Sequence, residues 1–124
     1  MAEDKRPESV RVPVPESWGD AFGGGENRQW LERKVYIGRD VKVEIGKLLD
    51  IGYSQQKAFQ RLCEIFSNCI TGWGFTTEDG EALPDPWQNP DAFDALADIS
   101  LDLFLWCSRA IHTPLHFLVS VEKN

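Results

Sequence analysis

Apolar residues recur at helical spacing in the middle of the chain and predict its clearest element, a helix over residues 54–70. Within this range they fall at i, i+1, i+4, i+5 and i+8, and the positions between them are polar. That spacing is typical of an amphipathic helix with one buried stripe. Ser54 suits the N-cap position. Cys63 and Cys69 lie on the stripe, which favours core packing over chemistry for both thiols.

A second helix is predicted over residues 90–112, with a kink near 98–100. Asn89 followed by Pro90 is a common helix start, since proline is favoured at the first helical position. From residue 99 to residue 111 nearly every position is apolar apart from a narrow polar stripe. A helix this apolar lies either at the centre of a core or in an interface. Because one other helix cannot cover it in so short a chain, we expect a partner or a second copy of the chain to do so. The residues expected to bind that partner are Leu101, Phe104, Leu105 and Trp106, together with Trp87 from the preceding loop.

Residues 34–46 fit two structures. Their apolar positions alternate on either side of a Gly-Arg-Asp turn, as in a β-hairpin. Ile37, Val41 and Ile45 also share one face of a helix, which Asp40 could cap. The density of β-branched residues and the two nearby glycines favour a short β-hairpin, which is our prediction.

Residues 1–26 are predicted to form a flexible, disordered N-terminal arm. They begin with a charged run, continue through a proline-interrupted segment and end near three consecutive glycines at 23–25. An arm of this kind could also dock on a partner through its valines and Trp18. The remainder, residues 27–124, is then a single helical domain, and the predicted fold class is mainly α.

The segment between the two helices is rich in tryptophan, glycine and proline. It opens with Gly72-Trp73-Gly74-Phe75 and continues through an acidic stretch to Pro90. Trp73, Phe75 and Leu83 are predicted to be structural anchors, because aromatic and large apolar side chains in such loops usually pack on a core. Glu78-Asp79-Gly80 is predicted to be a turn at an exposed tip.

The net negative charge of the chain argues against some classes of function. The net charge is −7 over 124 residues, and residues 71–124 alone hold two basic and nine acidic side chains. This acidity argues against binding to nucleic acid or to an acidic membrane, both of which need basic surfaces. It suits a basic protein partner or mimicry of DNA. No apolar run reaches the roughly 18 residues that a membrane span requires.

Candidate chemistry is sparse, and we expect a protein without enzymatic activity, metal or cofactor. The histidines, His112 and His116, flank a proline at a helix end, where His112 is expected to contact terminal carbonyl groups. The three cysteines lack the spacing of a zinc site. With no signal peptide in view, we expect a cytosolic protein with reduced thiols.

The loop and its flanking helices resemble the small tail assembly chaperones of long-tailed bacteriophages. The resemblance covers about residues 55–112 and rests on a Gly-Trp-x-Phe sequence, on Thr-x-Glu-Asp-Gly-x-x-Leu-Pro, and on an acidic helix start. The matching positions are Gly72, Trp73, Phe75, Glu78, Asp79, Gly80, Leu83, Pro84 and the run 91–96.

The resemblance implies a small, acidic, mostly helical and non-catalytic protein of the host cytoplasm. Such a chaperone binds the tape measure protein, helps recruit tail tube protein, and is missing from the mature virion. The family is often made in a longer form by ribosomal frameshifting, and Glu122-Lys123-Asn124 fits codons on which ribosomes slip. The alternatives from other classes are a virion structural or connector protein and a small acidic inhibitor that mimics DNA.

Overall fold

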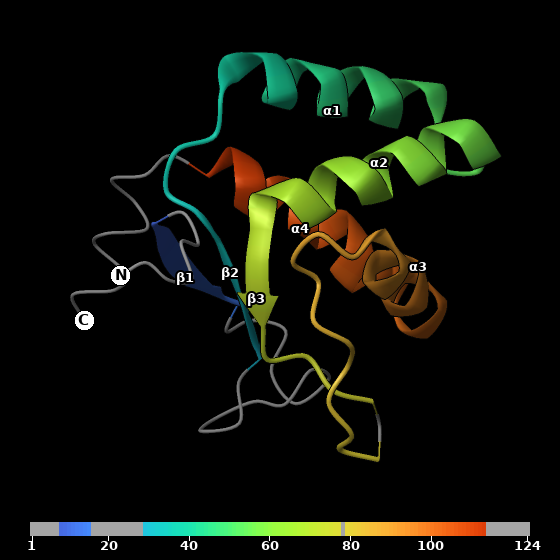
Figure 1. Ribbon diagram of the computed structural model, residues 1–124. Coiled ribbons are helices and arrows are strands. Elements are labelled where there is room, and N and C mark those ends of the chain that lie inside the picture. Colours follow the sequence, from blue (N-terminus) through green and yellow to red (C-terminus); the bar gives the residue numbers. More distant parts are fainter. Residues whose placement is uncertain (1–7, 16–28, 78, 114–124) are drawn as a thin grey trace.

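The helix α2 (Gln56–Cys69) occupies the middle of the fold and contacts elements on several sides. The computed structural model describes residues 8–15, 29–77 and 79–113, and these contain four helices and three strands. α2 packs against the other three helices and runs directly into the strand β3 (Ile70–Trp73) (Figure 1). The predicted helix over 54–70 is therefore confirmed, with its start at Gln56 rather than beside Ser54.

A small antiparallel sheet accompanies the helices, so the fold is helix-rich but mixed α/β rather than mainly α. Its strand order is β1 (Ser9–Pro13), β2 (Trp30–Lys34), β3. Val12 pairs with Leu31 and Leu31 with Trp73, and a bulge follows between Glu32 and Arg33. The predicted disordered arm over 1–26 is wrong for residues 9–13, because these residues form the strand β1. Pro13 is tolerated there because it lies at the end of an edge strand, where its missing N–H breaks no pairing. The rest of that arm lies outside the described residues.

The predicted β-hairpin over 34–46 is wrong. The segment instead enters the helix α1 (Arg39–Ile51), which begins after Gly38 and ends at Gly52. Ile45 is fully buried, and Val41 packs against the same core. The shared helical face of these residues therefore outweighed their β-propensity, as tertiary packing commonly does.

The predicted helix over 90–112 is two helices. α3 (Pro90–Ile99) begins at the expected proline, and α4 (Leu101–His112) follows after one extended residue, Ser100. The Ser100 side chain accepts a hydrogen bond of 3.2 Å from the N–H of Leu103 and so caps α4. The expected kink is thus a complete break, which turns α4 back across α2 (Figure 1).

The core lies where the helices meet the inner face of the sheet. Aromatic rings form a continuous series through it, with successive ring centroids 5.0–6.4 Å apart. Such tilted and edge-on pairs add to the free energy gained by burying the rings. In order of contact, the series runs Phe59, Phe104, Phe66, Phe93, Trp73, Phe75 and Trp106.

Candidate partner-binding surface

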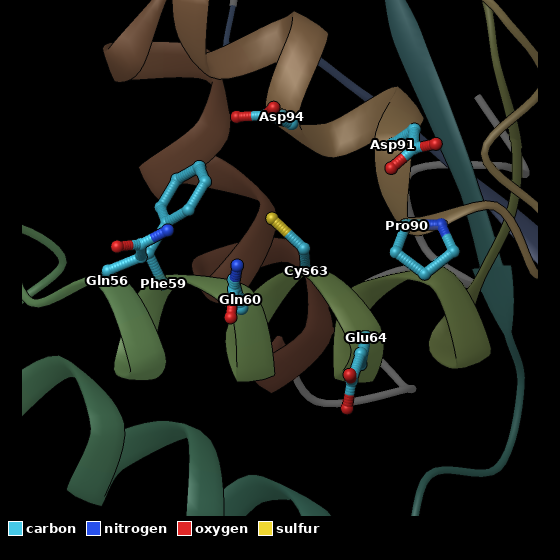
Figure 2. A pocket seen from close by; sticks show the side chains of 8 residues that line it. All are labelled: Gln56, Phe59, Gln60, Cys63, Glu64, Pro90, Asp91 and Asp94. Carbon is cyan, nitrogen blue, oxygen red and sulfur yellow. The ribbon is translucent and has the colours of Figure 1, made fainter.

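An open groove of about 590 Å³ lies between α2 and the start of α3. Figure 2 shows the side chains that line it, with those of α2 along one side and those of α3 facing them. The lining residues are Gln56, Phe59, Gln60, Cys63 and Glu64 from α2, and Pro90, Asp91 and Asp94 from α3.

The α2 side of the groove is one continuous stripe of the helix. Its five residues are spaced i, i+3, i+4, i+7 and i+8, so they lie on one face over roughly two turns, about 12 Å. Phe59 is partly buried and Cys63 is only 4% exposed. Gln56 and Gln60 are exposed beside them. The groove therefore has an apolar floor with amide groups at its edge.

The α3 side of the groove carries negative charge. Asp91 and Asp94 are both exposed, and no described residue forms a hydrogen bond or ion pair with either carboxylate. Glu64, on the α2 side, accepts a hydrogen bond of 3.1 Å from Arg61. The charge available to a ligand is therefore concentrated on the two aspartates of α3.

The Cys63 thiol points from α2 into the space between the helices (Figure 2). Burial, together with the smaller effect of the negative charges of Asp94, Asp91 and Glu64, raises the pKa of this thiol to about 12. Burial likewise raises the pKa of Cys69 and Cys107. A protonated, buried thiol is a poor nucleophile, so Cys63 serves here as a small apolar floor residue.

The end of the loop fixes α3 beside α2. The N–H of Gln88 donates a hydrogen bond of 2.8 Å to the carbonyl oxygen of Ser67 on α2. The Asp85 carboxylate accepts a 3.0 Å hydrogen bond from the N–H of Trp87, which shapes the turn before Asn89. Gln88 has a φ of 54°, a left-handed conformation that this turn requires. The groove therefore depends on the loop as well as on the two helices.

The five residues expected to bind a partner do not form one surface. Phe104 is fully buried and Trp106 is 6% exposed, because α2, α3 and the sheet cover that face of α4. Leu105 is partly buried against the same core, and Leu101 is 37% exposed at the start of α4. Trp87 lies in the loop, where the Lys34 ammonium is 5.2 Å from its ring centroid. The expectation that a partner must cover α4 is therefore corrected, since the chain itself covers it.

The three predicted anchors all contact the core. Phe75 is buried, and Trp73 and Leu83 pack partly buried against the same cluster. Trp73 lies 5.0 Å from Phe93 and 5.1 Å from Phe75, measured between ring centroids. The N–H of Leu83 donates a 3.2 Å hydrogen bond to the carbonyl of Phe75, so the loop returns on itself. Of the predicted turn at 78–80, residue 78 lies outside the described residues, and Gly80 is exposed with a φ of 89°.

A second hollow of about 220 Å³ lies where the β2–α1 connection passes α2. Ile37, Val41 and Ile65 contribute apolar surface to it, and Tyr36 at its edge is 85% exposed. Further exposed apolar side chains, Val43 and Ile51, lie on α1. This side of the molecule is therefore less acidic and more apolar than the groove.

Side chains that could bind a metal ion are spread over the described ranges rather than clustered. Within 8–15, 29–77 and 79–113, no three histidine, cysteine, aspartate or glutamate side chains lie close enough to hold a metal ion. His112 contacts carbonyl oxygens, as expected, with Nδ1 2.7 Å from Ser108 and Nε2 3.2 Å from Lys42. In the same ranges, every helix is too short or too polar to cross a membrane.

Comparison with protein families, with curated proteins and with solved structures gave no match to this chain. The site therefore has to be interpreted from its own geometry.

The sequence pattern places the groove residues on the correct helices but does not bring the helices together. Asp94 is exposed, as are Asp98 and Asp102, the acidic residues that follow it at intervals of four. The signal that could have located the groove is the Asn89-Pro90 helix start, which fixes where α3 begins. Its position beside Cys63 depends on the loop hydrogen bond to Ser67, which no periodicity reveals.

Proposed function

We propose that this protein is a non-catalytic assembly chaperone of the phage-tail type, which binds a tape measure protein and assists tail tube assembly. The observation that carries the proposal is the groove between α2 and α3, with its apolar floor and two carboxylates that no described residue pairs with. A chaperone needs a surface that holds a client without chemistry, and this groove has that composition. The resemblance over residues 55–112 supplies the class of client.

The remaining surface is consistent with this role. Tyr36, Val43 and Ile51 are exposed on the side of α1 and the connection before it. Single exposed apolar side chains of this kind are ordinary on protein surfaces, so the acidic groove remains the observation that supports the proposal. In this proposal the protein acts in the host cytoplasm, as a single chain or as a homo-oligomer, and leaves before the virion matures.

Co-expression tests the proposal. The tagged chain is produced together with a tape measure protein, the proposed client, and the complex is purified and analysed by light scattering. We expect co-purification in a defined ratio and a soluble client. A client that is equally soluble and unbound in the presence of the chain would overturn the proposal.

Mass spectrometry of purified particles separates this function from a structural role in the virion. A chaperone is expected to be missing from the particles, whereas a connector protein would be present in a fixed number of copies. Detection at that fixed ratio would replace the chaperone proposal with the structural one.

A further inference from the structure

We infer that the groove between α2 and α3 binds a basic, amphipathic helical segment of a protein partner, with a lysine or arginine side chain lying along its floor. The inference rests on the proposed function for the identity of the partner. The chemistry of the segment follows from the groove itself.

The floor suits the hydrocarbon part of such a side chain. Phe59 and Cys63 present an aromatic ring and a thiol that no described residue hydrogen-bonds. Lysine and arginine lay their methylene stems on apolar surface while the charged group stays in a polar setting. The ring of Phe59 also lies within the groove, where an aromatic face attracts a cation.

The rim suits the charged end. Asp91 and Asp94 are one helical turn apart on α3 and have no cation beside them among the described residues. Arg61, on α2, already forms ion pairs with Glu44 at 2.8 Å and with Glu64 at 3.1 Å. The described part of the chain therefore leaves these two carboxylates without a cation, and an incoming ammonium or guanidinium group would neutralise them.

The shape of the groove favours a peptide over a small molecule. Its residues on α2 extend about 12 Å, or roughly two helical turns, which matches side chains one turn apart on a docked helix. Most of its polar lining is exposed, so the site does not enclose a ligand as a small-molecule pocket does. The carboxamides of Gln56 and Gln60 are placed to hydrogen-bond the polar edge of such a helix.

Two synthetic peptides test the inference by titration into the full-length protein. One is an 18-residue helical peptide with leucines on one face and lysines and arginines on the other, and its counterpart has glutamates in place of the basic residues. Amide chemical shifts measured by NMR locate the binding site. We expect the basic peptide to shift residues 56–64 and 90–94, and the acidic peptide to leave them unchanged.

Two double variants of equal net charge test the role of the two carboxylates. Asp91→Asn with Asp94→Asn removes the rim, and Asp40→Asn with Asp50→Asn removes two exposed carboxylates of α1, one of them likewise in the first turn of its helix. We expect the first pair to weaken binding of the basic peptide about three- to tenfold more than the second, the effect of losing two exposed charge pairs. Asp94→Asn alone serves as a second variant, because it leaves the first turn of α3 unchanged.

Three outcomes would overturn the inference: no binding of the basic peptide, chemical shifts confined to another surface, or equal weakening by both pairs of variants. These failures differ from failure of the proposed function. A natural client that co-purifies equally with the wild type and with the Asp91→Asn, Asp94→Asn variant would leave the chaperone function standing while removing the groove from it.

Discussion

Arg33 joins the sheet to the last helix through hydrogen bonds from a single side chain. Its guanidinium group is 2% exposed and donates to the carbonyls of Ala110 (3.1 Å), Ile111 (2.7 Å) and Thr113 (3.1 Å). Its two other hydrogen bonds go to the carbonyls of Lys34, the last residue of β2, and Val35, the residue after it. Burial lowers the pKa of this group, while the negative end of the α4 dipole favours its charge. One arginine therefore supplies hydrogen bonds to three carbonyl groups at the C-terminal end of α4.

Replacing Arg33 with lysine should destabilise the fold strongly. Lysine keeps the charge but cannot reach several carbonyls with a planar fork. Because hydrogen bonds to charged groups contribute about 1.5–3 kcal/mol each, we expect Arg33→Lys to lower the free energy of unfolding by about 3–5 kcal/mol. Urea denaturation measures this. Arg109→Lys, at an exposed position of α4, should change it by less than about 0.5 kcal/mol. Equal effects of the two substitutions would contradict the role given to Arg33.

The burial of Phe75 could be predicted from the sequence, whereas the burial of Arg33 could not. Phe75 is apolar, and its burial follows from its residue type. Arg33 lies in a charged run that resembles a solvated segment. It lies on the inner face of the sheet because it is two residues from Leu31 on β2, and residues two apart on a strand share a face. That spacing could be used only if the strand had been recognised.

At the scale of elements, the break at Ser100 makes α3 and α4 separate helices. The N–H of Ser100 donates to the carbonyl of Leu96, and its own carbonyl accepts from Phe104, so the residue ends one helix and begins the next. Its hydroxyl then holds the first turn of α4. The sequence predicted this discontinuity only as a kink near 98–100. The complete break is consistent with the preference of serine for helix caps over helix interiors.

Removing the Ser100 hydroxyl should cost about the energy of one helix cap. We expect Ser100→Ala to lower the free energy of unfolding by about 1 kcal/mol, and Ser100→Asp to preserve it. Ser108→Ala is the matched control, since its hydroxyl bonds to the Leu105 carbonyl within the helix and should matter little. Thermal unfolding followed by circular dichroism distinguishes them. Loss of stability in both Ser100 variants would show that the capping bond is not the cause.

The pairing of α1 with α2 includes an ion pair at the surface. Arg61 on α2 donates hydrogen bonds of 2.8 and 3.2 Å to the two carboxylate oxygens of Glu44 on α1. The hydrogen bond from Arg61 lowers the pKa of Glu44 below its ordinary value. A lowered pKa means that the folded state is stabilised above the unfolded-state pKa of the carboxyl group. This stabilisation is lost as the pH falls through the folded-state pKa.

The Glu44 contribution should therefore depend on pH. At pH 7 we expect Glu44→Gln to lower the free energy of unfolding by roughly 0.2–1 kcal/mol, the range of exposed pairs. The difference from the wild type should shrink as the pH falls below about 4, where carboxyl groups take up protons. Urea unfolding at a series of pH values measures it. Asp50→Asn, an exposed change on the same helix, is the control, and a Glu44→Gln effect independent of pH would contradict this account.

The elements differ in how far the sequence could predict them. α2 is found because its apolar stripe fits only one periodicity. α1 fits two, and its helical structure is decided by packing of Ile45 against neighbouring helices. β1 was hidden by Pro13 and by Pro15 just beyond it, although an edge strand tolerates a proline at its end. Long-range pairing of this kind leaves no local signal in the chain.

At the scale of the whole molecule, the chain covers its own apolar helix and leaves an acidic groove open. α4 contributes Phe104, Trp106 and Cys107 to the core, so the apolar surface that seemed to need a partner is already buried. The groove between α2 and α3 keeps two carboxylates without a cation among the described residues. The surface offered to a client is therefore charged at its rim and apolar at its floor.

The most direct test of the proposed function is the solubility of the client. The tape measure protein proposed as the client is produced alone, with the wild-type chain, and with the Asp40→Asn, Asp50→Asn control. Its fraction in the supernatant is measured after ultracentrifugation. We expect most of the client to be soluble, and bound, only when the chain or its control variant is present. A client that sediments equally with and without the chain would contradict the proposed function.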